Sequence, residues 1–142
     1  MNATSAATAS AVTFVWLGMV LAISFLEAPL KFRAPGVSVR IGLAIGRLVF
    51  RALNVVECVL ATTVVVAVAA GDPPGRIVGW TVAAVVLLIG QLAVIRPRLN
   101  RRSDRILAGE DLPRSRGHLF YVAFEAAKVV ALLGLGVTLL AL

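Results

Sequence analysis

The stretch Gly46-Arg-Leu-Val-Phe-Arg-Ala-Leu-Asn-Val-Val-Glu57 opens an apolar run that is long enough to form a membrane-spanning helix. At about 100° per residue, Arg47, Arg51 and Asn54 fall within about 60° of arc on one face of that helix. Glu57 lies about 80° to one side of this face. Ionisable side chains in hydrocarbon cost about 2.5–3.5 kcal/mol each, so other helices are expected to supply partners for them.

Four apolar runs define the predicted architecture, and each can cross a hydrocarbon core of about 30 Å. Proline and glycine mark the first two breaks, at residues 33–40 and 71–75, and Pro29 predicts a kink or an end in the first helix. The third break is an arginine-rich connection. We therefore expect one transmembrane domain, residues 1–142, folded as an all-α integral membrane four-helix bundle. The predicted helices span residues of about 11–32, 41–70, 76–95 and 118–142.

The distribution of positive charge predicts the orientation of the bundle. The formal net charge is +7, and the connection 96–117 carries seven arginines against three acids. Lys and Arg gather in cytoplasmic loops, so this connection is expected in the cytoplasm and both termini on the other side. The connection is also expected to meet anionic lipid headgroups, and its residues Ser103 to Leu107 to form a short interfacial helix.

The composition excludes several classes of function. The chain is 60% hydrophobic, and its basic residues suit membrane topology rather than a nucleic-acid module. Cys58 is the single cysteine and His118 the single histidine, so neither an intrachain disulfide nor a multi-histidine metal site can form. The sequence contains no nucleophile–base pair and no phosphate-binding glycine loop. We therefore predict no metal, no cofactor and no catalytic residue, and we favour a protein that is not an enzyme.

Polar residues of all four predicted helices fall at similar depth, in the half of the membrane nearer the basic connection. Three acids balance three bases there, and Arg51 is predicted to pair with an acid from another helix. His118 is expected to be an interfacial anchor. The residues predicted to form this ligand-binding or polar cluster are Glu27, Arg47, Arg51, Asn54, Glu57, Gln91, His118, Tyr121, Glu125 and Lys128.

Two interpretations of this layer stay open. In one, the polar residues form a structural clamp that fixes the rotation of the helices while the arginines reach toward the headgroups. In the other, Arg47 and Arg51 line a cytoplasm-facing pocket for a lipid phosphate, a carboxylate or a small anion. Gly42 and Gly46 form a small-xxx-small pair that suits either an internal contact or a homodimer contact.

Several short motifs resemble those of small four-helix bacterial membrane proteins of unknown function, and more distantly those of the group related to copper-resistance D proteins. The chain lacks the histidines and methionines that copper handling requires, so the resemblance implies the architecture and no copper chemistry. The motifs are Trp16-Leu-Gly-Met, Glu27-Ala-Pro-Leu-Lys-Phe-Arg, Gly46-Arg-Leu-Val-Phe-Arg and His118-Leu-Phe-Tyr, the last followed by Glu125 and Lys128.

The leading hypothesis is a multi-pass protein of the bacterial inner membrane that binds or carries a small anionic or lipidic ligand. A proton-coupled small dimeric exporter is the first alternative, with Glu27 or Glu57 as the titrating group. A structural or accessory subunit of a membrane complex is the second alternative.

Overall fold

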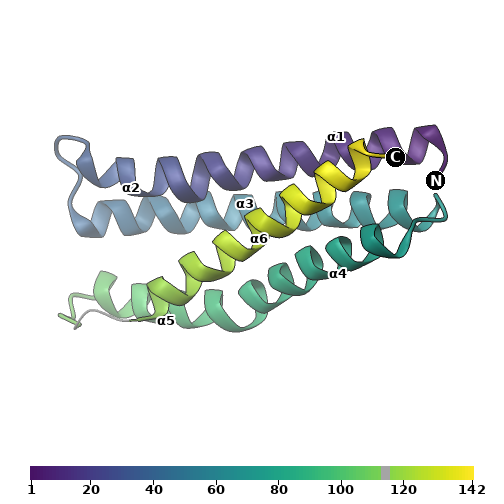
Figure 1. Cartoon of the computed structure of the whole chain (residues 1–142). Helices are drawn as coiled ribbons and strands as arrows, with labels where there is room; N and C mark the ends of the chain where they lie inside the picture. Colours follow the sequence, from purple (N-terminus) through teal and green to yellow (C-terminus); the bar gives the residue numbers. More distant parts are fainter. Residues whose placement is uncertain (113–115) are drawn as a thin grey trace.

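The chain folds into a bundle of four long helices, and the computed structural model describes residues 1–112 and 116–142. No strand occurs in these two ranges. Both termini lie at one end of the bundle together with the turn 70–74, and we call this the terminal end (Figure 1). The segments 34–38 and 108–112 lie at the opposite end, which we call the basic end (Figure 1).

The first long helix begins at Ala3 because the Asn2 side chain accepts a hydrogen bond from the backbone N–H of Ser5 at 2.8 Å. It stays helical to Arg33, although its hydrogen-bonding pattern changes on the way. Its parts are α1 (Ala3–Val20), the π-helical segment η1 (Leu21–Glu27), α2 (Ala28–Leu30) and the 3-10 turn η2 (Lys31–Arg33).

The other three long helices follow with short connections. The Ser38 side chain caps the second, and Gly109 follows the third with a φ of +97°, which glycine adopts without strain. The second helix is α3 (Val39–Ala69), the third consists of α4 (Gly75–Gly90), the π-helical segment η3 (Gln91–Ile95) and α5 (Arg96–Leu107), and the fourth is α6 (Gly117–Leu140).

The third helix runs farther than the sequence predicts, because Pro97 does not interrupt it. The prediction ended this helix at residue 95 and gave residues 103–107 a separate helix, whereas the structure keeps one helix from Gly75 to Leu107. A proline lacks an N–H and crowds the carbonyl four residues earlier. In η3 the backbone N–H of Arg96 bonds instead to the carbonyl of Gln91, five residues back, and this wider turn makes room for the ring.

The same arrangement occurs in the first helix, where Pro29 follows η1. Here the N–H of Ala28 bonds to the carbonyl of Ile23, again five residues back. The first helix does not end at Pro29, where a kink or an end was predicted; the helix type changes there and the helix continues to Arg33. Each π-helical segment ends two residues before a proline.

All four helices are long and apolar enough to cross a membrane, so the predicted all-helical fold with four candidate membrane spans is confirmed for the described residues. Many large apolar side chains on their outer faces are exposed, as expected for surfaces that face lipid. The spans are Ala3–Arg33, Val39–Ala69, Gly75–Leu107 and Gly117–Leu140.

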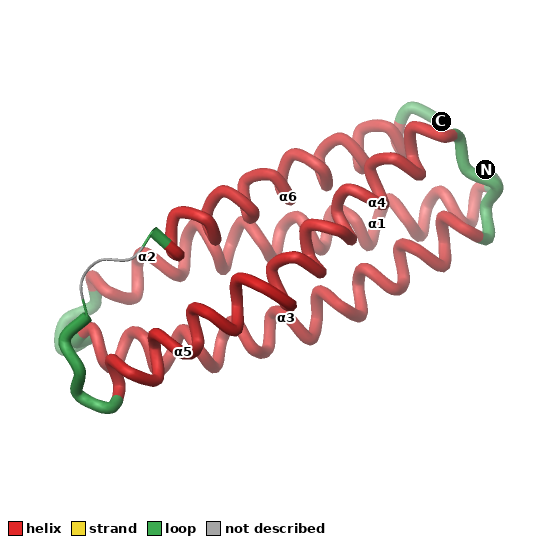
Figure 2. The backbone as a smooth tube through the Cα atoms, turned by 90° about the horizontal axis from the view of Figure 1, so that it is seen from below, coloured by secondary structure: helices red, strands yellow, loops and turns green. Residues whose placement is uncertain are grey.

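The helices pack in a ring, in which α1 contacts α3 and α6, and α4 contacts the other sides of α3 and α6 (Figure 2). The apolar core inside this ring has two parts. One lies toward the terminal end and includes Val64, Leu88 and Leu132. The other lies toward the basic end and includes Leu53 and Tyr121. A layer of polar side chains separates the two parts.

Gly42 and Gly46 make an internal contact, which is one of the two alternatives left open by the sequence. A Cβ atom on Gly42 would overlap the ring of Phe32, and a Cβ on Gly46 would lie 2.8 Å from Nζ of Lys31. Gly42 therefore lets the end of the first helix approach α3 closely, whereas the group beside Gly46 is the end of a flexible side chain.

Candidate functional site

The predicted polar residues do not form one layer, and seven of the ten divide between two regions. The first, which we call the central cluster, is buried inside the ring of helices. It consists of Trp16, Glu57, Gln91, Glu125 and Lys128. The second, which we call the lateral pocket, opens between α3 and the third helix. It is lined by Arg47, Leu48, Arg51, Asn54, Val55, Cys58, Leu92, Arg96 and Asn100.

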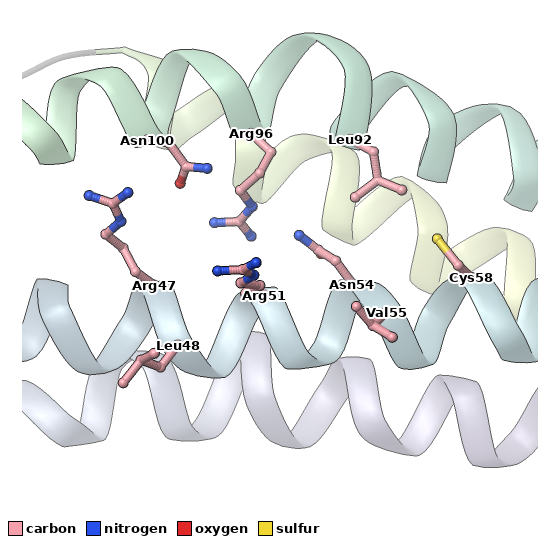
Figure 3. A pocket seen from close by; sticks show the side chains of 9 residues that line it. All are labelled: Arg47, Leu48, Arg51, Asn54, Val55, Cys58, Leu92, Arg96 and Asn100. Carbon is pink, nitrogen blue, oxygen red and sulfur yellow. The ribbon is translucent and has the colours of Figure 1, made fainter.

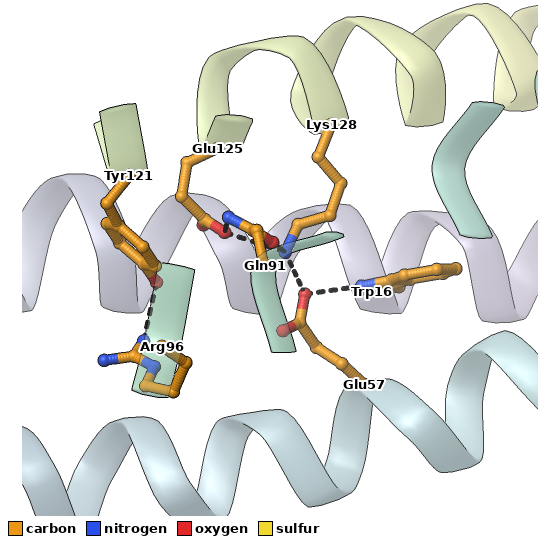
Figure 4. Close-up of polar contacts among 7 residues, drawn as sticks. All are labelled: Trp16, Glu57, Gln91, Arg96, Tyr121, Glu125 and Lys128. Carbon is orange, nitrogen blue, oxygen red and sulfur yellow. Dashed lines mark hydrogen bonds and ion pairs between the residues drawn. The ribbon is translucent and has the colours of Figure 1, made fainter. Parts of the chain in front are cut away.

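Lys128 is the hub of the central cluster (Figure 4). Its Nζ lies 2.6 Å from Oε1 of Glu57 and 2.7 Å from Oε1 of Glu125. It also donates to Oε1 of Gln91 at 2.6 Å, so three acceptors surround the ammonium group. The Lys128 side chain is fully buried, and the two glutamate side chains are each 2% exposed.

Two neutral donors complete the cluster. The indole Nε1 of Trp16 donates to Oε1 of Glu57 at 2.9 Å, and the amide Nε2 of Gln91 donates to Oε1 of Glu125 (Figure 4). Oε2 of Glu125 is buried without a hydrogen-bond partner among the described residues. Each of the four long helices thus contributes at least one member, which fixes their rotation relative to one another.

The central cluster lies deep along the length of the bundle. Glu57 and Lys128 are each twelve residues from the terminal ends of their helices, Ala69 and Leu140, which corresponds to about 18 Å. A hydrocarbon core is about 30 Å thick, so a bundle that spans it with these four helices would hold the cluster near its centre. Charges here need the compensation that Lys128 gives the two carboxylates.

The lateral pocket has a volume of about 610 Å³, which is within the range of about 300–1,000 Å³ that is usual for ligand sites. Arginine side chains from α3 and from the start of α5 point into the space between the two helices (Figure 3). Asn100 lies beside Arg47 at one end of the pocket, and Asn54 lies between the arginines and the other end, which Val55, Leu92 and Cys58 line.

The three arginines of the pocket differ in how their charge is balanced. Arg47 forms an ion pair with Asp104 of α5. The guanidinium of Arg96 lies 4.5 Å from the ring centre of Phe50 and 4.8 Å from that of Tyr121, and it donates to the Tyr121 hydroxyl at 3.1 Å. Within residues 1–112 and 116–142, no acid forms an ion pair with Arg96.

Arg51 is exposed, and it forms no ion pair or hydrogen bond with any residue that the structure describes. The prediction that it pairs with an acid of another helix is therefore wrong. Helix packing explains the difference, since the rotation of α3 turns Glu57 into the core and Arg51 toward its edge. The carboxylates of Glu57 and Glu125 are both bound to Lys128 and face inward.

The remaining predicted residues lie outside these two regions or connect them. Glu27 forms a local pair with Lys31, one helical turn away, at 3.6 Å. His118 is exposed near the start of α6, as expected for an anchor at the membrane surface. Tyr121 is buried and meets the ring of Phe50 edge-on, with ring centres 5.5 Å apart, while its hydroxyl holds Arg96.

Arg96 and Asp104 were not among the predicted site residues, because Arg96 was assigned to a non-helical part of the basic connection and Asp104 to a separate short helix at the membrane surface. A signal was present, since Ile95, Leu99 and Ile106 continue the apolar spacing of a helix beyond the predicted end. Trp16 was not among the residues predicted for the polar cluster, and nothing in its sequence context shows that its indole donates to Glu57.

The chemistry that these groups support is the binding of an anion by arginine and amide donors in the lateral pocket. The described residues contain no group of three His, Cys, Asp or Glu side chains that would hold a metal ion. No match to the chain is found among protein-family models, curated proteins or solved structures.

Proposed function

We propose that this chain is a membrane protein that binds an anionic group of the phosphate or carboxylate type in the lateral pocket. The observation that carries the proposal is that Arg51 and Arg96 line one pocket and neither is paired with an acid of the described residues. Unpaired cations in a largely apolar setting attract a counter-charge, and an anionic ligand supplies it.

The geometry of Arg96 supports the proposal, because its guanidinium is held in place before any ligand arrives. The two aromatic rings and the Tyr121 hydroxyl restrict its rotation. A guanidinium that is already fixed loses less entropy when it forms paired hydrogen bonds to an oxyanion. Asn54 and Asn100 add donors that suit the remaining oxygens.

The proposal includes an orientation and a location. The excess of Lys and Arg at the basic end favours the cytoplasm for that end and the opposite side for both termini. We place the protein in a bacterial inner membrane and assign it a binding or carrier role without catalysis.

A thermal-shift experiment in detergent tests the pocket. The probes are inorganic phosphate, sulfate, citrate and glycerol phosphate, each at several concentrations. We expect at least one of them to raise the melting temperature of the wild type, because a ligand that binds the folded state stabilises it. Arg51→Gln should abolish the shift, and Arg76→Gln, which removes the same charge at the terminal end, should keep it. The proposal fails if no probe shifts the wild type or if both variants lose the shift equally.

A second candidate, a proton-coupled exporter, is favoured by the central cluster, where two carboxylates share one ammonium group deep in the bundle. Of the two glutamates predicted for this role, Glu57 is buried among all four helices, whereas Glu27 is about one third exposed and lies outside the central cluster.

A further inference from the structure

The lining of the lateral pocket changes from charged to apolar along its length. Arg47 and Asn100 lie at one extreme and Cys58 at the other, with Arg51 and Arg96 between them (Figure 3). Eleven residues of α3 separate Arg47 from Cys58, which corresponds to about 16 Å. A small anion would need only the charged end, whereas an amphiphile would use both.

The depth of the charged end matches the level of lipid headgroups. A hydrocarbon core takes about 20 helical residues. A count of about 20 residues from the terminal end reaches Phe50 on α3 and Ile95 on the third helix. Arg51 and Arg96 are the direct neighbours of these two residues in the sequence. The guanidinium groups thus lie near the level at which phospholipid phosphates meet the hydrocarbon. The apolar end of the pocket lies deeper, within the hydrocarbon itself.

The side of the pocket that faces away from the bundle is open to the bilayer. Leu48 is 71% exposed and Val55 is 62% exposed, so both lie on the lipid-facing surface of α3 at the rim of the pocket. A lipid of the surrounding leaflet can therefore enter sideways, without passing through the protein and without dehydrating its acyl chains.

We propose that the lateral pocket binds an anionic glycerophospholipid from the adjacent leaflet. The phosphate lies between Arg51 and Arg96, and one acyl chain runs along Val55, Leu92 and Cys58. This inference rests on the proposed anion-binding function and narrows its ligand to a lipid. Charge complementarity selects an anionic over a zwitterionic headgroup, because two unpaired guanidinium groups face one phosphate.

Native mass spectrometry of the detergent-purified protein can distinguish binding through the lipid headgroup from binding through its acyl chain. The probes are phosphatidylglycerol, phosphatidylcholine and glycerol phosphate. Cys58→Phe fills the apolar end of the pocket and leaves the arginines in place, and Val59→Phe introduces the same side chain at an exposed neighbour that does not line the pocket. Arg51→Gln removes one phosphate contact.

We expect the wild type to retain phosphatidylglycerol in preference to phosphatidylcholine. Cys58→Phe should weaken phosphatidylglycerol binding about tenfold and leave glycerol phosphate binding unchanged, because only the acyl contacts are lost. Arg51→Gln should weaken both ligands, and Val59→Phe should weaken neither.

Other results overturn the inference in distinguishable ways. Equal retention of the two lipids would mean an apolar groove without headgroup recognition. If glycerol phosphate binds and phosphatidylglycerol does not, the anion site stands and its lipid ligand is refuted. A dimer that Cys58→Phe abolishes would identify a second copy of the chain as the occupant. If no probe binds, the proposed function fails together with the lipid.

Discussion

Glu57 and Arg51 lie six residues apart on the same helix, yet one charge is paired inside the protein and the other is not. Glu57 is 2% exposed, is bound to Lys128 and accepts a hydrogen bond from Trp16. Arg51 is exposed and has no acid partner among the described residues. The difference follows depth, because a charge at the membrane centre must be compensated within the protein. A charge at the outer edge of the bundle needs no partner within the protein, and a ligand can pair with it.

The largest expected effect is that of Lys128→Met, which leaves the Glu57 and Glu125 carboxylates together without a cation. Breaking a buried ion pair by removing one partner typically costs about 3–5 kcal/mol, and we expect a loss of stability in that range. Unfolding in mixed detergent micelles measures it.

The matched control for Lys128→Met is a triple variant that also carries Glu57→Gln and Glu125→Gln. It should recover much of the loss because no charge remains unpaired in the cluster. If Lys128→Met alone is as stable as the wild type, the central cluster does not hold the helices together.

Trp16→Phe should have an intermediate effect. It keeps an aromatic ring in the core and removes the donor to Glu57, and hydrogen bonds to charged groups contribute about 1.5–3 kcal/mol. Trp80→Phe is the control, since Trp80 is 36% exposed and its indole forms no hydrogen bond with a described residue. Equal losses in the same unfolding assay would mean that ring size, and not the hydrogen bond, decides the effect.

Asp104→Asn should have the smallest effect on stability, because the Arg47–Asp104 pair is partly exposed and such pairs contribute about 0–1 kcal/mol. The same substitution should strengthen anion binding in the lateral pocket. With no acid beside it, Arg47 becomes a third unpaired cation, so anion affinity measured by titration should rise. Asp72→Asn makes the same charge change at the terminal end and should leave the affinity unchanged. A fall in affinity with Asp104→Asn would contradict this account of the pocket.

The four-helix architecture follows from the sequence because hydropathy and length decide it. Helical periodicity also placed Glu125 and Lys128 on one face of the fourth helix, and both are in the central cluster. Length, hydropathy and the face on which a residue lies are properties of a single helix, so they can be predicted from its sequence alone.

Rotation and pairing of the helices could not be obtained in this way. Periodicity puts Arg51 and Glu57 about 120° apart, but it does not say which of the two faces the core. Packing decides this, since the ring of helices closes around Glu57 and leaves Arg51 outside. The continuity of the third helix through residues 96–102 was also missed, because proline and arginine suggest a loop while the π-helical turn that accommodates Pro97 has no clear sequence signature.

That turn makes the number of residues in the third helix as important as their identity. A π-helical turn holds one residue more than the α-helical turn it replaces, so the residues after η3 are rotated by about 100° from the direction an uninterrupted α-helix would give them. Gln91 on one side of this offset faces the core, and Arg96 on the other side faces Phe50 and Tyr121 at the pocket. A chain one residue shorter here would keep the composition almost unchanged and turn Arg96 away from both rings.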